Sequence, residues 1–190
     1  MIDLSQDFDM KIYGAESGAQ KENATLFNDE SEYKKEKSNG NLTRAANLGY
    51  QAAEEFVKVC RRDELTLNEG DNEQIALQRI LLLSFTVMAG FEEFCPNMTL
   101  ANSARSAFFD KLAVIDKELF EKSSDTGAFS FYYLSFRRGN DVERRIGQTF
   151  AMLCLHDGDP IYQELGEALY CWFFSTLDNM VKNSGFVDTL

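Results

Sequence analysis

The sequence predicts an all-α protein, a bundle of about six antiparallel helices with a polar N-terminal arm. Apolar residues recur at spacings of three and four through most of the chain after residue 42. Residues typical of helix starts and stops separate these stretches. Connections of mostly under ten residues favour antiparallel packing of neighbouring helices. Only two prolines interrupt the 190 residues, and no stretch clearly predicts a sheet.

The first 41 residues differ in composition from the rest and are predicted to form the polar arm. They contain nine acidic residues and five lysines, with Gly, Ser and Asn around two short apolar islands. The islands are Phe8-Met10-Ile12 and Leu26-Phe27. We expect the arm to be either flexible or docked through these islands, on its own body or on a neighbour. Residues 42–190 form the predicted helical bundle domain.

Two of the predicted helices form the centre of the bundle. The helix over residues 73–94 is apolar nearly all round, so other helices must surround it. The helix over 160–182 begins at Asp159-Pro160, a cap residue followed by proline in the first turn. The remaining helices are expected over 43–62, 99–122, 129–138 and 142–155, with Thr99 and Asp141 as N-caps of the second and fourth of these. In the first, Ala45, Gly49, Ala52 and Ala53 share a face that permits close approach of another helix.

The charge balance narrows the classes of partner. The chain has 31 acidic and 19 basic residues, a formal charge of −12. Because phosphate backbones and anionic lipids select basic surfaces, we expect no nucleic-acid partner and no membrane binding. The longest apolar stretch, residues 80–91, would span about 18 Å as a helix against about 30 Å of hydrocarbon, which predicts a buried helix. The acidic start of the sequence lacks the basic region of a signal peptide, so a cytoplasmic location is expected.

No motif in the sequence identifies a catalytic or cofactor site. His156 is the only histidine, which removes the Glu-x-x-His pairs of di-iron bundles and restricts any catalytic triad to this residue. Glycine-rich phosphate loops and Cys-x-x-Cys pairs are absent from the sequence. We therefore expect no metal and no cofactor, and we favour a protein without catalysis over an enzyme. The cysteines are expected to be reduced structural thiols: Cys60, Cys95, Cys154 and Cys171.

A basic segment between two predicted helices is the first candidate ligand site. Its four arginines fall within nine positions of an acidic chain: Arg137, Arg138, Arg144 and Arg145. Arginine binds phosphate or carboxylate through two parallel hydrogen bonds, and Tyr132 and Tyr133 one turn upstream can stack on a planar ligand. A structural explanation competes: the first two arginines suit a helix C-terminus, and the last suits an ion pair with Asp141. Only Arg144 lacks such an explanation.

The second candidate is the loop His156-Asp157-Gly158-Asp159-Pro160. Between two carboxylates an imidazole holds its proton more strongly, so His156 can serve as an acid–base group or bind a metal with both aspartates. Alternatively, the residues have ordinary structural roles. His156 would then end one helix, Gly158 would form the turn and Asp159 would cap the next helix.

Adjacent aromatic residues indicate a second aromatic face on several helices. They occur at Phe108-Phe109, Tyr132-Tyr133 and Trp172-Phe173-Phe174. Neighbours on a helix point about 100° apart, so both members of a pair cannot always face one core. The second face is then a subunit interface, a groove filled by the arm, or part of a well-filled core.

Two functions of different classes follow from these features. The first is a non-catalytic helical interaction or regulatory module that self-associates through an aromatic helix face or binds a protein partner. The second is a protein or enzyme that binds a small anion, phosphate or carboxylate, at residues 137–145 with the neighbouring tyrosines and His156.

Overall fold

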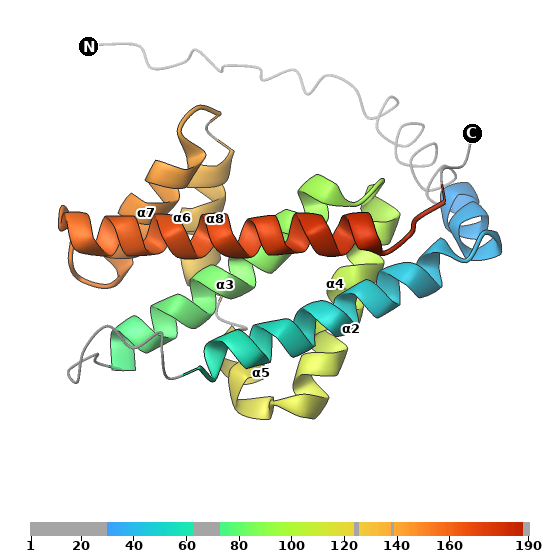
Figure 1. Cartoon of the computed structure of the whole chain (residues 1–190), viewed down its shortest axis with the longest axis horizontal. Coiled ribbons are helices and arrows are strands. Elements are labelled where there is room, and N and C mark those ends of the chain that lie inside the picture. Colours follow the sequence, from blue (N-terminus) through green and yellow to red (C-terminus); the bar gives the residue numbers. More distant parts are fainter. Residues whose placement is uncertain (1–29, 63–72, 124–125, 138, 188–190) are drawn as a thin grey trace, which may run out of the picture.

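The computed structural model describes residues 30–62, 73–123, 126–137 and 139–187, and within them the chain is all-helical with no strand, as predicted. Residues 30–38 are helical, in addition to the seven helices of Figure 1. These are α2 (Asn41–Cys60), α3 (Glu73–Phe94), α4 (Met98–Ile115), α5 (Lys117–Ser123), α6 (Thr126–Phe136), α7 (Val142–Leu153) and α8 (Pro160–Asn183). The apolar islands Phe8-Met10-Ile12 and Leu26-Phe27 lie outside the described residues.

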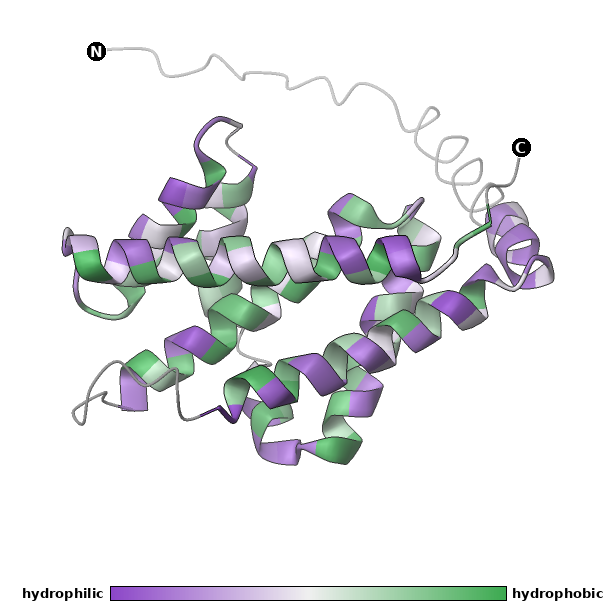
Figure 2. Cartoon of the chain, viewed as in Figure 1, coloured by the Kyte–Doolittle hydropathy of each residue, from purple (hydrophilic) through white to green (hydrophobic). Residues whose placement is uncertain are grey.

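The two helices predicted as central, α3 and α8, cross the middle of the molecule (Figure 1). The N-cap predicted for α8 is confirmed, because the Asp159 carboxylate accepts from the Ile161 N–H at 2.9 Å and Pro160 follows in the first turn. α3 is apolar along most of its length in Figure 2, whereas α2 and α8 alternate between apolar and polar residues. α3 therefore has neighbours on several sides.

Among the described residues α3 is the one helix long and apolar enough to cross a membrane, judged by length and composition alone. In its most apolar window of 18 residues, 72% is buried inside the chain. Core helices pass the same test, so this feature does not by itself indicate a membrane span.

Two hydrophobic cores share α3 and α8. The first core lies among α2, α4 and α5, and it receives Val87 and Phe91 from α3. The second lies among α6 and α7, and it receives Leu82 and Phe85 from α3. Because α3 is apolar nearly all round, successive residues of one helix face both cores.

The close approach predicted for the small-residue face of the first helix is confirmed. At Gly49 in α2, an added Cβ would lie 2.2 Å from the Ala104 carbonyl oxygen of α4. Farther along the same contact, the rings of Phe56 and Phe108 meet edge to face at 5.5 Å between centroids. The absence of a side chain at Gly49 sets the distance between these two helices.

The predicted helix over 99–122 is wrong at its start and in its middle. Asn97 is the N-cap in place of Thr99, and its side chain accepts from the Leu100 N–H at 2.9 Å. The helix then breaks at Asp116, where φ is −153° and ψ is 88°. The Asp116 carboxylate accepts two hydrogen bonds of 2.9 Å from Arg61, which is 55 residues away, and one of 3.1 Å from the Leu119 N–H in α5.

The structure also corrects the role predicted for Asp141. Asp141 occupies the N-cap position of α7, but its φ is 58° and its side chain makes no capping hydrogen bond. The predicted ion pair with Arg145 is not formed between these two described side chains. Arg145 instead donates from Nε to the Ser135 carbonyl at 3.3 Å.

The end of the predicted arm, residues 30–41, is bound to the body through a group of amides around Glu36. Glu36 is buried, and its carboxylate accepts from the side chains of Asn41 at 2.7 Å, Asn39 at 3.1 Å and Asn97 at 2.9 Å. The Asn41 amide also pairs with the backbone of Val187, accepting from its N–H at 2.9 Å and donating to its carbonyl at 3.0 Å. We call these five residues the Asn41 clasp, since they join residues 30–41, α4 and the C-terminal segment.

Candidate ligand-binding groove

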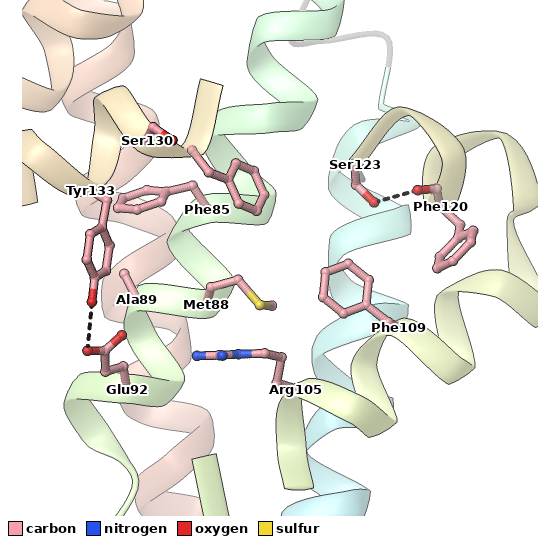
Figure 3. Close-up of a pocket in the computed structure, with 11 residues that line it drawn as sticks. Phe85, Met88, Ala89, Glu92, Arg105, Phe109, Phe120, Ser123, Ser130 and Tyr133 are labelled. Atoms are coloured by element: carbon pink, nitrogen blue, oxygen red, sulfur yellow. Dashed lines mark hydrogen bonds between the residues drawn. The ribbon is translucent and has the colours of Figure 1, made fainter. Parts of the chain in front are cut away.

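An open groove of about 780 Å³ lies between α3, α4, α5 and α6. It follows the side of α3 where the two hydrophobic cores meet (Figure 3). We call it the aromatic groove and define it by its lining residues: Phe85, Met88, Ala89, Glu92, Arg105, Phe109, Phe120, Ser123, Phe129, Ser130 and Tyr133.

The floor of the aromatic groove is one face of α3. Phe85, Met88, Ala89 and Glu92 are spaced by three, one and three residues, which places them along one side of the helix. Phe85 also packs into the second core, where its ring stacks on Tyr132 at 5.4 Å between centroids. The floor is therefore held by core packing rather than by a loop.

One wall consists of α4 and α5, which the break at Asp116 folds against each other. Phe109 of α4 and Phe120 of α5 meet edge to face at 6.3 Å between centroids. Arg61 holds the break from α2 through its two hydrogen bonds to Asp116 and a third to Glu118 at 2.9 Å. These contacts lower the pKa of Asp116: the hydrogen bonds from Arg61 are the largest cause, and they outweigh the effect of burial.

The other wall is α6, whose two faces have different roles. Phe129, Ser130 and Tyr133 face the aromatic groove. Tyr132, one position earlier, is fully buried in the second core. In the aromatic pairs at 108–109 and 132–133, one member is in a core and the other lines this groove. The second aromatic face predicted from the sequence is thus, for these pairs, the lining of one groove.

Charged groups gather at one end of the aromatic groove. The Tyr133 hydroxyl donates to Glu92 Oε1 at 3.3 Å, as drawn in Figure 3. The Arg137 guanidinium lies 4.4 Å from the centre of the Tyr133 ring and 3.9 Å from the same carboxylate oxygen. Glu92 therefore has a hydrogen-bond donor and a cation beside it.

Arg105 is a cation of the aromatic groove that has no hydrogen-bond or ion-pair partner among the described residues. Figure 3 shows its side chain reaching from α4 across the end of the groove toward α3, near Glu92. Its Nε is shielded from solvent and has no hydrogen-bond partner in the part of the chain that the structure describes. Within the described residues no carboxylate lies within ion-pair distance of it. A guanidinium in this setting can bind a carboxylate or a phosphate group through parallel hydrogen bonds.

The arginines predicted from the sequence do not meet at one site in the described residues. Arg137 and Tyr133 come together beside Glu92, at the edge of the aromatic groove. Arg144 is exposed on α7, and Arg145 bonds the backbone of Ser135. Arg138 lies outside the described residues. Tyr132 is inside the core, and its hydroxyl has no hydrogen-bond partner among the described residues.

His156 lies in a different place, in the connection between α7 and α8. Its ring stacks on Tyr162 at 3.8 Å between centroids with the planes 7° apart. Its backbone N–H donates to the Ala151 carbonyl at 2.9 Å, and Asp159 caps α8. In the described part of the chain no group of three or more His, Cys, Asp or Glu residues is arranged to hold a metal ion.

None of the four cysteines, all of which are among the described residues, forms a disulfide. Burial raises the pKa of Cys60 and of Cys95 to about 12, so at neutral pH both are protonated. Burial likewise raises the pKa of Cys171. Since the thiolate is the nucleophilic form, these positions suit packing better than covalent chemistry.

Sequence reasoning missed Arg105, Glu92 and Phe120 as groove residues. Arg105 is an isolated charge on an amphipathic helix, and nothing in its neighbourhood separates it from a solvent-facing arginine. Phe109 could have indicated this position. It lies four residues after Arg105 on α4, so the two side chains share one face of the helix, and Phe109 is the member of its aromatic pair that the first core does not fully bury.

Comparison of this chain with protein-family models, with curated proteins and with solved structures finds no match. Any functional assignment therefore depends on the physical properties of the aromatic groove and of the surface.

Proposed function

We propose that this chain is a non-catalytic binding module whose aromatic groove takes a small amphipathic molecule with one negatively charged group. The observation that carries this proposal is Arg105, a half-buried guanidinium aimed into an apolar groove with no carboxylate partner among the described residues. A buried donor without an acceptor is unfavourable by about 1–3 kcal/mol, and an anionic ligand group removes that penalty.

The body of the ligand is apolar or aromatic. Apart from Arg105, Glu92, two serines and the Tyr133 hydroxyl, the lining consists of Phe, Met and Ala side chains. A volume of about 780 Å³ is in the range of small-molecule sites, which are mostly apolar with a few polar groups that fix orientation. Burial of an alkyl or aromatic body supplies the affinity, and Arg105 supplies the orientation.

The head group carries one charge rather than two. Glu92 lines the same end of the groove as Arg105 (Figure 3), so a dianion would experience repulsion that a monoanion largely escapes. Tyr133 and Arg137 beside Glu92 reduce this repulsion. We therefore favour a carboxylate over a phosphate monoester.

Binding without chemistry is favoured by the composition of the lining. It contains no histidine and no cysteine, and the Ser123 hydroxyl already donates to the Phe120 carbonyl at 3.0 Å. This lining therefore lacks the Ser–His and Cys–His pairs of nucleophilic catalysis.

The test uses the full chain and four probes in thermal denaturation and calorimetry. Octanoate has the charge and the apolar body, octanol has only the body, acetate only the charge, and octyl phosphate a second charge. We expect octanoate to raise the melting temperature most, because a ligand that binds only the folded state stabilises it. Equal effects of octanol and octanoate would contradict the role given to Arg105.

Two arginine variants locate the head group. Arg105→Gln should weaken octanoate binding about 10- to 100-fold, since a hydrogen bond to a charged group contributes about 1.5–3 kcal/mol. Arg144→Gln removes an equivalent charge from the predicted arginine cluster, outside the groove, and should leave the affinity unchanged. If Arg144→Gln weakened octanoate binding more than Arg105→Gln did, the binding site would lie at residues 137–145 instead.

Self-association, the other function expected from the sequence, is kept as a second candidate because Trp172 on α8 is 42% exposed. Sedimentation equilibrium tests self-association: a monomer at every concentration would rule it out.

We also propose that successive helices pack antiparallel, as the short connections between them favour. We propose the cytoplasm as the location, because four cysteines without a disulfide among the described residues suit a reducing compartment.

A further inference from the structure

A stripe of exposed residues runs along the outer side of α8. Ile161, Glu164, Ala168 and Trp172 are spaced by three, four and four residues, so they lie in line on the helix. All four are exposed, and the exposed fractions of Ile161 and Trp172 are 65% and 42%. We call these four residues the α8 stripe.

Leu155 adds an apolar side chain next to the start of α8, at a position where the backbone does not favour it. It is 82% exposed, and its φ of 63° lies in the left-handed region that glycine and asparagine adopt most easily. The connection that carries it is held by the stacking of His156 on Tyr162 and by the His156 N–H donating to Ala151. An apolar residue that is exposed and unfavourable for the backbone does not stabilise the isolated chain.

The charged side chains along the segment that carries the α8 stripe are all acidic. Between Arg145 and Lys182 the sequence contains no lysine or arginine. The same stretch contains five acids: Asp157, Asp159, Glu164, Glu167 and Asp178. A second copy docked stripe against stripe would bring Glu164 and Glu167 of both chains together, which like-charge repulsion disfavours.

We propose that the α8 stripe and Leu155 form a docking surface for a basic amphipathic helix of a protein partner. The apolar face of that helix would cover Leu155, Ile161 and Trp172, and its lysines or arginines would lie beside the flanking acids. Helix-in-groove partners are recognised by this combination of apolar anchors and complementary charge. The surface is separate from the aromatic groove, whose lining includes no residue of α7 or α8.

Trp172 reports directly on this surface because it is the only tryptophan of the chain. The probe is a synthetic helical peptide of Leu and Lys, about 18 residues or five turns long, with its leucines on one face. The control is the same peptide with Glu in place of Lys. We expect the Leu–Lys peptide to shift Trp172 emission to shorter wavelength and to reduce its quenching by acrylamide, and the Leu–Glu peptide to do neither.

Two matched variants separate docking from general attraction between a cationic peptide and an acidic protein. Leu155→Asn removes the apolar side chain and suits the positive φ, so the melting temperature should stay equal or rise while peptide affinity falls about tenfold. Val114→Asn removes an apolar side chain of equal exposure, 82%, from α4 and should leave the affinity unchanged.

The proposal would be overturned if Leu155→Asn and Val114→Asn lost affinity for the Leu–Lys peptide equally. Equal binding of the Leu–Lys and Leu–Glu peptides would also overturn it. So would a shift of Trp172 emission with protein concentration alone, because a second copy would then be the occupant. Octanoate binding to the aromatic groove is measured separately, and neither result depends on the other.

Discussion

Glu36 is a buried acid that is charged because three amides surround it. Burial alone would raise the pKa of Glu36, but the hydrogen bonds from Asn41, Asn39 and Asn97 outweigh it, and the net pKa lies below its ordinary value. A depressed pKa in the folded state means that this group stabilises the fold above its unfolded pKa. That contribution is lost as the pH falls through the folded pKa.

We therefore expect Glu36→Gln to lower the free energy of unfolding by about 2 kcal/mol at pH 7, because hydrogen bonds to a charged acceptor are replaced by weaker ones. The difference from the parent should shrink as the pH falls below the ordinary glutamate pKa, and urea unfolding at several pH values measures it. Glu30→Gln is the control, since among the described residues Glu30 pairs only with Lys34, at the surface. A Glu36→Gln difference that stays constant with pH would contradict the role of the charge.

At the scale of a helix pair, Gly49 determines how closely α2 approaches α4. Alanine in place of glycine normally stabilises a helix interior by about 1 kcal/mol. Here the added Cβ would lie 2.2 Å from the Ala104 carbonyl oxygen and 2.8 Å from the Ala107 side chain. We expect Gly49→Ala to lower the free energy of unfolding by about 1–3 kcal/mol, the range for overpacking, so the sign of the usual effect is reversed.

Chemical denaturation measures this change, and Asn47→Ala on the exposed side of α2 is the matched control. The control should be neutral or slightly stabilising because it gains helix propensity without a clash. A stabilised Gly49→Ala protein would show that α2 and α4 can separate without loss.

Most helix positions were predictable from local patterns, and the break at Asp116 was missed because a distant residue decides it. α3 begins and ends at the predicted residues because its apolar run is long, with only Ser84 and Thr86 as polar residues between Ile80 and Phe91. The break at Asp116 depends on Arg61, 55 residues earlier, and no local pattern contains that pairing. The position of Asp141 was predicted correctly, but its capping bond was not, because its backbone adopts a left-handed conformation.

In the candidate site, too, the residues that could not be predicted are those brought together from distant parts of the sequence. Tyr133 and Arg137 were identified from the sequence and do lie at the edge of the aromatic groove. Arg105 and Glu92 come from α4 and α3, so their meeting depends on how those helices are placed around the two cores. Composition indicates that surplus aromatics need a second face. Only the packing shows that Phe109 and Tyr133 share one.

At the scale of the whole molecule, the aromatic groove lies where two separately packed groups of helices meet. α2, α4 and α5 surround the first core, α6 and α7 the second, and both cores share α3 and α8. The first group contains the close α2–α4 contact at Gly49, whereas α6 has only 11 residues and exposes Phe131 and Leu134. Shorter helices with fewer buried side chains open at a lower free energy.

Native-state hydrogen exchange should therefore show α6 and α7 opening as one unit, at a lower free energy than α2 and α4, with α3 most protected because both cores bury it. Octanoate in the aromatic groove touches α6 as well as α4 and α5, so a saturating concentration should raise the opening free energy of α6 by RT ln(1 + [L]/Kd). In Arg105→Gln this increase should largely disappear at the same concentration, although Arg105 itself is on α4. If the amides of all helices exchange with the same opening free energy, the two cores form a single cooperative unit. A ligand in the aromatic groove would then stabilise the whole chain, and the division into two groups of helices would be wrong.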